Sequence, residues 1–204
     1  MSLGVDIDHI ADALATRTPQ VADNSPGDRA AVAIILHERI GIGPQVLIIE
    51  RARRQGDPWS GDLAFPGGRM EPHDDGDQHT AERETREEIG LDLGTARLLG
   101  RLDDRAARVL PLTVCAFVYA IDTIPAMELS NEVAEVFWID LADIVASERH
   151  CEHQQYPAVD LLGPGHPLLW GVTYFFLCAL LRDVGHELPV SVPVGRITEP
   201  GNRP

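Results

Sequence analysis

The chain has 204 residues, 44% of them hydrophobic and 24% charged, which is the composition of one globular domain with terminal extensions. Its 32 acidic residues outnumber 17 Lys and Arg, and the net charge of −15 argues against binding to a nucleic-acid polymer or an anionic membrane. A small phosphorylated ligand stays compatible with this charge, because bound divalent cations reverse the local sign of an acidic cleft.

The cysteines and the apolar segments give no sign of secretion or membrane insertion. Cys115, Cys151 and Cys178 are widely spaced and odd in number, which predicts reduced thiols rather than disulfides or a zinc site. Residues 1–10 lack the basic and apolar regions of a secretory signal, and the apolar stretch 167–181 is shorter than the ~20 residues that span a bilayer. We therefore expect a cytoplasmic protein without a membrane partner.

The N-terminal part of the chain predicts a helix followed by a β-hairpin. Apolar side chains recur at helical spacing within 5–15, and a polar link rich in Pro, Asp and Asn follows over 18–28. Residues 30–36 and 45–50 are β-branched runs separated by Gly41-Ile42-Gly43-Pro44, which is typical of two paired core strands.

The remainder of the chain alternates between helical and extended patterns. A helix is predicted over about 78–89, where Gly90 supplies a stop signal. Further strands are predicted over 96–102, 109–121 and 133–139, and further helices over 141–147 and 168–184. Interleaved elements of this kind predict an α/β fold, with a sheet covered by helices on both faces. The expected division is a helix and link over 1–28, a main domain over 29–186 and an irregular tail over 187–204.

Three glutamates carry the clearest chemical signal. Glu84, Glu87 and Glu88 are three and four positions apart, so their carboxylates share one face of the predicted helix. Such like charges repel one another unless a cation lies between them, and hard oxygen ligands select Mg²⁺, Ca²⁺ or Mn²⁺. A solvated acidic face paired with Arg83 and Arg86 is the alternative.

A glycine-containing loop favours the metal-binding interpretation over the solvated face. Phe65-Pro66-Gly67-Gly68 precedes the helix, and its glycines allow close backbone approach to a ligand. A backbone carbonyl beside a carboxylate cluster would complete a metal cage. We therefore expect this loop and the helix to form one site.

These residues resemble the Nudix family. The segment Arg83-Glu84-Thr85-Arg86-Glu87-Glu88-Ile89-Gly90-Leu91 matches the second half of the family's box, with Thr85 at an aliphatic position. The loop before Arg83 is one residue longer than in the box, and Asp74 or Asp75 stands where the box has a Glu. The resemblance implies a Nudix-type α/β/α sandwich with a mixed β-sheet.

Further segments resemble the coenzyme A pyrophosphatase branch of this family. The longer loop, Phe65-Pro66-Gly67-Gly68 and Glu71-Pro72 are similar to that branch. The segment Leu47-Ile48-Ile49-Glu50-Arg51-Ala52 keeps the Arg of the branch's upstream signature but not its Thr or Ser. Residues 131–138 and 169–173 are also similar.

The resemblance implies residue roles around Mg²⁺ or Mn²⁺. The implied metal ligands are the Gly68 carbonyl, Glu84, Glu87, Glu88 and the loop carboxylate Glu132, which matches a further ligand of some family members. Glu84 is the candidate general base, although Glu87 and Glu132 stay open for that role, and Arg83 would orient a glutamate through charge-assisted hydrogen bonds. Water bound to the metal would attack phosphorus in line.

Basic and aromatic side chains elsewhere are less informative. Arg51 and Arg54 lie in the densest basic cluster and either hold substrate phosphates or remain exposed. The aromatic side chains within 170–176 are interpreted as core packing rather than as a platform for base stacking.

The predicted function is metal-dependent hydrolysis of a diphosphate bond in a small nucleotide derivative, with coenzyme A or a related compound as the leading substrate. Hydrolysis of ADP-ribose, nucleotide sugars or nucleoside triphosphates is the alternative within enzymes. A non-catalytic nucleotide-binding sensor is the alternative of another class. A homodimer is usual in the family and is included as an expected assembly.

Overall fold

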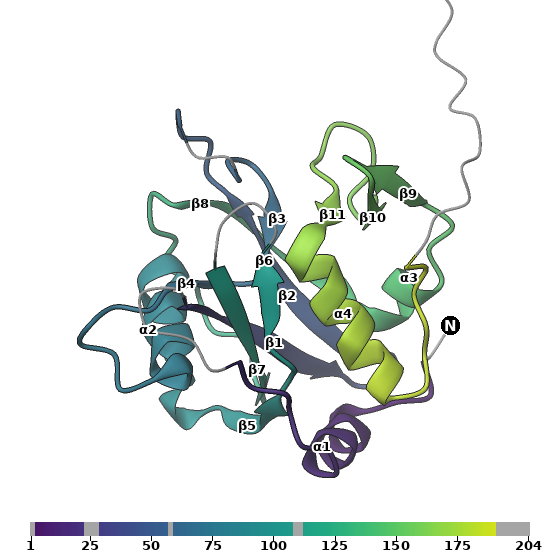
Figure 1. Cartoon of the computed structure of the whole chain (residues 1–204). Helices are drawn as coiled ribbons and strands as arrows, with labels where there is room; N and C mark the ends of the chain where they lie inside the picture. The colour runs from purple at the N-terminus through teal and green to yellow at the C-terminus, as the bar shows by residue number, and fades with distance from the viewer. Residues whose placement is uncertain (1–2, 23–28, 57–58, 108–111, 191–204) are drawn as a thin grey trace, which may run out of the picture.

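A central mixed sheet separates the helices of the molecule (Figure 1). The computed structural model describes residues 3–22, 29–56, 59–107 and 112–190. The helices are α1 (Ile7–Ala15), α2 (Asp77–Ile89), the 3-10 turn η2 (Leu93–Thr95), α3 (Leu141–Val145) and α4 (Gly171–Asp183). The strands of the main sheet are β1 (Arg29–Arg39), β2 (Gly43–Arg51), β3 (Leu63–Ala64), β4 (Gly67–Arg69), β5 (Arg97–Arg101), β6 (Arg105–Ala107), β7 (Leu112–Ile121) and β8 (Val133–Asp140). The smaller sheet has β9 (His150–His153), β10 (Tyr156–Val159) and β11 (Leu169–Trp170).

Strand β1 organises the main sheet. It runs parallel to β7 and antiparallel to β2 and β4, so the sheet is mixed. Along one edge, β1 has two different partners. Strand β2 pairs with the C-terminal part of β1, whereas Gly67 and Gly68 of β4 pair with Val32 and Ala31 near its N-terminal end. Strand β4 therefore reaches the sheet at a single short stretch.

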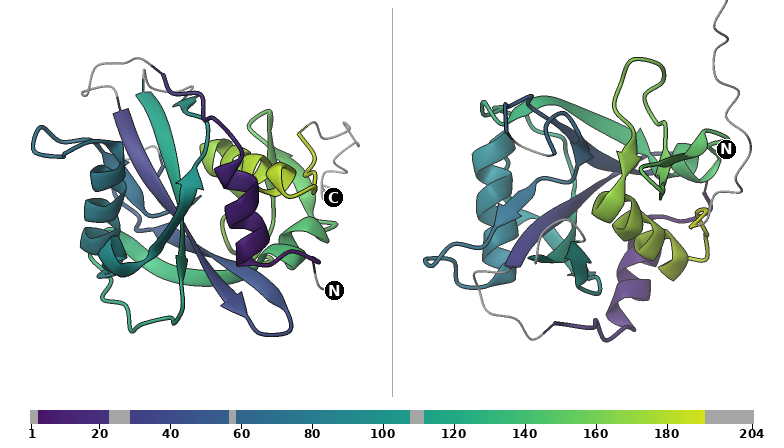
Figure 2. Two further views of the ribbon diagram at one scale, coloured as in Figure 1. Left: turned by 90° about the horizontal axis from the view of Figure 1, so that it is seen from below. Right: turned by 45° about the horizontal axis from the view of Figure 1, so that its top comes forward.

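The two faces of the sheet are buried in two separate cores. Alternate β1 residues such as Ala31 and Ile35 pack with Ala81 of α2 on one face. The intervening residues, such as Ile34, pack with α1 and α4 on the other face. Figure 2 shows α2 on the opposite side of the sheet from α1 and α4. The predicted α/β class with helices on both faces is confirmed, and burial on both faces explains the unbroken apolar runs of the central strands.

The ends of α1 and α2 carry recognisable caps, of which only the Gly90 stop was predicted from the sequence. Asp6 caps α1 by accepting a hydrogen bond from the His9 amide at 2.9 Å. Helix α2 ends at Gly90, whose φ of 71° is the left-handed conformation that favours glycine. The helix predicted from residue 168 begins later, because Leu169 and Trp170 are extended and pair with β10.

Several elements were not predicted from the sequence. They are the short strands β3, β4, β6 and the whole smaller sheet, each of two to four residues. The start of the strand predicted over 109–121 lies outside the described residues up to position 111. Among the described residues, none of the helices combines the length and apolar character that a bilayer crossing needs.

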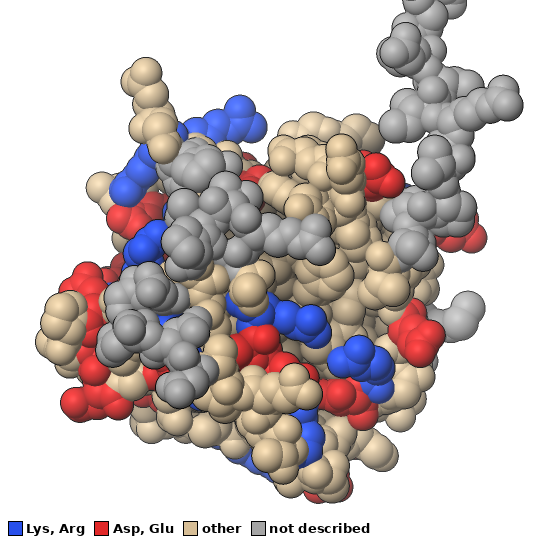
Figure 3. All heavy atoms as spheres, in the orientation of Figure 1, with Lys and Arg blue, Asp and Glu red and all other residues tan. Residues whose placement is uncertain are grey.

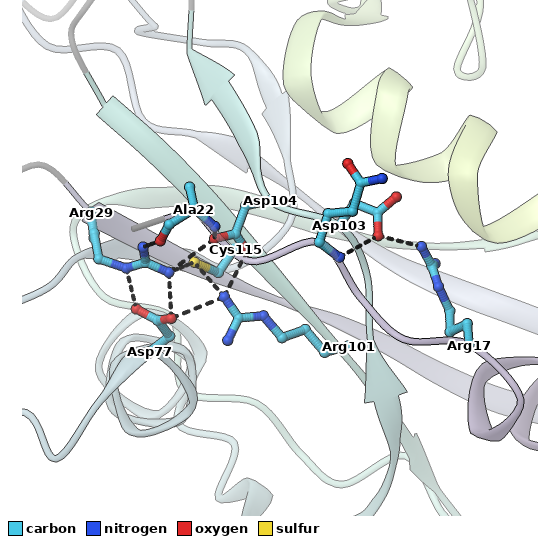
Figure 4. A network of polar contacts seen from close by, with 9 residues as sticks. Arg17, Ala22, Arg29, Asp77, Arg101, Asp103, Asp104 and Cys115 are labelled. Carbon is cyan, nitrogen blue, oxygen red and sulfur yellow. Dashed lines mark hydrogen bonds and ion pairs between the residues drawn. The ribbon is translucent and has the colours of Figure 1, made fainter. Parts of the chain in front are cut away.

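An ion-pair network anchors the start of α2 to the sheet (Figure 4). Arg29 donates to both Asp77 oxygens at 2.7 and 2.6 Å and to Asp104 at 3.0 Å, and Arg101 donates to Asp104 at 2.6 Å. Burial alone would raise the pKa of Asp77, but the Arg29 hydrogen bonds lower it overall. Burial also raises the pKa of the Cys115 thiol to about 12, and the three cysteines are free, as predicted.

Candidate active site

The carboxylates of α2 meet the backbone of β4. Glu88 is 3% exposed, and its Oε2 accepts a hydrogen bond of 2.9 Å from the Gly67 amide. The Glu84 side chain is 17% exposed, and that of Glu87 is 59% exposed. The three glutamates therefore run from a buried position beside the glycines to an open position on the surface.

The two glycines are required by close contacts. A Cβ added at Gly68 would lie 2.4 Å from Cδ of Glu84 and 2.5 and 2.6 Å from its two oxygens. Gly67 has φ of 151°, and a Cβ there would lie 2.3 Å from the Ala31 carbonyl oxygen. The structure thus brings the glycine loop and the helix carboxylates together, as the sequence predicted.

Burial and crowding of negative charge affect the protonation of these carboxylates. Burial raises the pKa of Glu88 to about 7, against the opposing hydrogen bond from Gly67, and the charges of Glu84 and Glu132 raise it further. Burial is also the main cause of the raised pKa of Glu84, and Arg83 opposes it. Desolvated carboxylates that face one another are stabilised in their charged form by a nearby cation.

Arg83 lies between a buried aspartate and the helix glutamates. Its Nε and Nη2 donate to the two oxygens of Asp74 at 2.8 and 3.0 Å, and Nη2 also donates to the Arg69 carbonyl at 3.1 Å. Its Nη1 lies 3.0 Å from Glu84 and 3.2 Å from Glu87. The guanidinium is therefore fixed on one side and directed at both glutamates on the other.

In the loop before α2, Asp74 is the aspartate that is buried against Arg83, whereas Asp75 is not. The Asp74 side chain is fully buried and also accepts a hydrogen bond of 3.0 Å from the Thr80 hydroxyl. Hydrogen bonds from Arg83 are the main cause of its lowered pKa. Asp75 is exposed. The sequence left these two residues as alternatives, and burial distinguishes them.

The donor atoms fit a hard divalent cation. Among the residues that the structure describes, no three His, Cys, Asp or Glu side chains are already grouped around one point. Arg83 lies beside both Glu84 and Glu87. The available donors are nevertheless carboxylate oxygens, and no side chain separates the Gly68 backbone from Glu84. Oxygen donors of this kind suit Mg²⁺ or Mn²⁺.

Two of the remaining predicted residues lie at the edge of this site. Arg54 donates to Glu132 at 2.9 Å and to Asn131 Oδ1 at 2.7 Å, so this arginine already has protein partners. Glu132 is half-exposed, and its charge adds to the effect of burial in raising the pKa of Glu84 and Glu88. Glu132 is thus close enough to act electrostatically on the α2 carboxylates, and its metal-binding role stays a prediction. A phosphate-binding role for Arg54 requires it to leave Glu132.

A cavity of about 590 Å³ opens on the other side of the glycines. Its lining includes Gly67, Gly68 and Arg51, and its floor is formed by residues of the α4 side of the sheet. The volume lies within the roughly 300–1,000 Å³ of small-molecule sites. Figure 3 shows acidic side chains gathered over α2 and a mostly uncharged surface over β11 and the start of α4. The carboxylates and the cavity thus lie on opposite faces of the sheet and meet at the two glycines.

Aromatic side chains from distant segments line this cavity. They are Trp59, Phe65, Tyr156, Trp170 and Phe175. The expectation of core packing holds for Tyr174 and Phe176, which are fully buried, but it is wrong for Trp170 and Phe175, which are half-buried at the cavity wall. Helical periodicity did not reveal this wall, because β10 and β11 place residues far apart in the sequence side by side.

Comparisons with known proteins agree with this architecture. An uncharacterized protein of Schizosaccharomyces pombe, C14C4.10c, is 33% identical, with 72% of this chain and 52% of that protein covered. The mitochondrial coenzyme A diphosphatase NUDT8 of Homo sapiens is 36% identical, with 71% and 64% covered. The peroxisomal coenzyme A diphosphatase ndx-8 of Caenorhabditis elegans is 33% identical, with 87% and 78% covered. The chain thus spans between half and two thirds of the length of the first two relatives. The NUDIX domain profile matches residues 27–161, and the chain belongs to the NUDIX family.

Proposed function

We propose that this chain hydrolyses the diphosphate bond of coenzyme A or a closely related nucleotide derivative, with Mg²⁺ or Mn²⁺ as cofactor. The observation that carries the proposal is the contact of Glu84 and Glu88 with the Gly67–Gly68 backbone at the mouth of an aromatic-lined cavity. The names of the human and C. elegans relatives support coenzyme A as the substrate.

The residues of the chain have distinct parts in this reaction. The Gly68 carbonyl, Glu84, Glu87 and Glu88 would hold the cation, with Glu132 as a further carboxylate beside them. When bound, the cation supplies charge neutralisation for the diphosphate and a lowered pKa for the attacking water. Glu84 is the candidate that accepts the proton of that water, and Arg83, held by Asp74, positions its carboxylate. Glu87 and Glu132 are the other candidates for the base.

Substrate positioning follows from the two faces of the sheet. The diphosphate would lie against the backbone of Gly67 and Gly68, close to the carboxylates of α2. One substituent of the diphosphate would extend into the cavity, and Arg51, which lines the cavity together with Gly67 and Gly68, is a basic side chain placed to meet the diphosphate. We further propose that the substrate is a small molecule, that the protein is cytoplasmic and that it forms a homodimer. Size-exclusion chromatography with light scattering measures the oligomeric state.

A chromatographic screen for phosphomonoester products, run with Mg²⁺ or Mn²⁺, tests the proposed function, because cleavage of the diphosphate bond in coenzyme A, ADP-ribose or a nucleotide sugar releases two phosphomonoesters and no inorganic phosphate. Coenzyme A, ADP-ribose, nucleotide sugars and nucleoside triphosphates are compared with wild type, Glu87→Gln and the control Glu148→Gln. Glu87→Gln is expected to lose at least ~100-fold in rate, the lower range for removal of a key transition-state group. Glu148 is exposed and distant in sequence from the box, so its variant keeps the wild-type rate.

Other outcomes have defined meanings. Preferential turnover of ADP-ribose or a nucleotide sugar would move the substrate assignment, and binding of these compounds without turnover would indicate a nucleotide sensor. An unchanged rate for Glu87→Gln would contradict the site itself.

A further inference from the structure

Arg105 lies at the far end of the cavity from the α2 carboxylates. Strand β6 places it opposite Val114 of β7, and it lines the same cavity as Gly67 and Gly68. The strands follow one another as β4, β1, β7 and β6 across this part of the sheet. Three strand spacings amount to about 14 Å, so Arg105 is a separate charged position rather than part of the diphosphate site.

Arg105 forms no salt bridge with a carboxylate in the described part of the chain, although its charge contributes to the lowered pKa of nearby Asp103. Its Nε is buried and lacks a hydrogen-bond partner there. The two preceding carboxylates are held by other arginines: Asp103 pairs with Arg17 at 2.7 Å, and Asp104 pairs with Arg29 and Arg101 (Figure 4). A guanidinium is always charged and donates in a fork that fits an anion.

The aromatic wall of the same cavity is suited to a flat ring. Five aromatic side chains, named above, reach it from the segments before and after β3, from β10 and β11 and from α4. Rings of this kind stack on nucleobases, and the interaction tolerates different bases because each has a π-face. A ligand that combines a base with an anionic group would therefore use both features of the cavity.

We propose that this cavity binds the nucleoside end of the substrate and that Arg105 recognises a phosphate monoester on its ribose. This inference rests on the proposed function, because coenzyme A carries such a group at the 3′ position. In a chain with a net charge of −15, a phosphate remote from the cations needs a dedicated basic partner. Arg105 thus selects coenzyme A over its 3′-dephospho form, in which the phosphate is absent.

The test compares kcat/KM for coenzyme A and 3′-dephospho-coenzyme A in three proteins. Arg105→Gln is expected to lower kcat/KM for coenzyme A by about 10- to 100-fold, the range for a lost hydrogen bond to a charged group. The kcat/KM of this variant for 3′-dephospho-coenzyme A is expected to stay within about threefold of the wild-type value. Arg97→Gln is the matched control, since Arg97 on β5 pairs with Asp8 of α1 and does not line the cavity; it changes neither value.

A second measurement separates this inference from the proposed function. Isothermal titration calorimetry compares adenosine 3′,5′-bisphosphate with AMP and requires no turnover. The inference holds if Arg105→Gln removes the preference for the bisphosphate, even where coenzyme A is not hydrolysed. It is overturned if the variant leaves the preference for coenzyme A or for the bisphosphate intact, or if both coenzyme A forms lose rate equally.

Folding of the variant has its own check. Arg105 lies on a short peripheral strand, and circular dichroism melting shows whether Arg105→Gln keeps the wild-type unfolding temperature. If it does not, Arg105→Lys keeps the charge and most of the stem. This second variant is expected to retain the 3′-dephospho rate and lose part of the coenzyme A rate, whereas an unaltered ratio of the two rates would overturn the inference.

Discussion

Substitution of Gly68 by Ala isolates the contact between β4 and the helix carboxylates. The new Cβ would lie 2.4 Å from Cδ of Glu84, whereas ordinary contacts begin near 3.4 Å, so the carboxylate must move by about 1 Å. A misplacement of that size in a catalytic group costs about 100-fold in rate. We therefore expect kcat to fall about 100-fold in Gly68→Ala.

The same substitution should leave the protein folded. The clash involves the end of a flexible side chain, so the free energy of unfolding falls by only about 1 kcal/mol or less, and the reduced entropy of the unfolded chain offsets part of this loss. Turnover of coenzyme A measures the rate, and urea denaturation measures stability. A rate within threefold of wild type would refute the claim that Gly68 defines the position of Glu84.

Gly67→Ala is the matched contrast. Its Cβ would lie 2.3 Å from the backbone oxygen of Ala31, and its φ of 151° is unfavourable for alanine. The paired backbone of β1 cannot move away from the new Cβ, and φ cannot relax, without a large increase in free energy. We expect a loss of stability on the order of 3 kcal/mol. Equal stability of the two variants would contradict this assignment of the contacts.

Three further predictions concern charge. Asp74→Asn leaves the buried Arg83 without its bidentate partner, so urea denaturation should show about 3 kcal/mol less stability; a change below 0.5 kcal/mol would be inconsistent with a buried pair. The lowered pKa of Asp77 means that its stabilisation is present above its usual value near 3.8 and is lost as pH falls below it. Melting temperatures of Asp77→Asn should therefore depend less on acid pH than those of wild type, and parallel curves would argue against the Arg29 pair. Chelation of divalent cations should reduce turnover at least ~100-fold, with recovery in excess Mg²⁺; activity that persists in chelator would rule out the proposed cofactor.

Local signals accounted for the regular elements around the site. Gly90 and the helix-forming composition before it predicted α2, and the apolar runs predicted β1 and β2. The shared face of Glu84 and Glu88 followed from helical spacing alone. These features depend on residues that are close together in the sequence.

Features that depend on long-range pairing could not be predicted. The two residues of β11 have helix-compatible neighbours, and only pairing with β10 makes them extended. The cavity wall combines Trp59 with Tyr156 and Trp170, and these two residues lie about a hundred positions after Trp59 in the sequence. Arg105 carried no local signal, because its significance depends on which carboxylates other arginines already occupy. Asp74 was separated from Asp75 only by burial.

The short glycine strand has a consequence for how selectivity can change. Gly67 and Gly68 have no side chains, so only their backbone separates the α2 carboxylates from the cavity. One bound molecule can therefore contact groups on both sides of the sheet. Substitutions at Trp170 or Phe175 can alter which compound enters without moving any group on α2. If the proposed function holds, the residues that break the bond and the residues that select the compound lie in separate parts of the chain, and each set can diverge while the other is preserved.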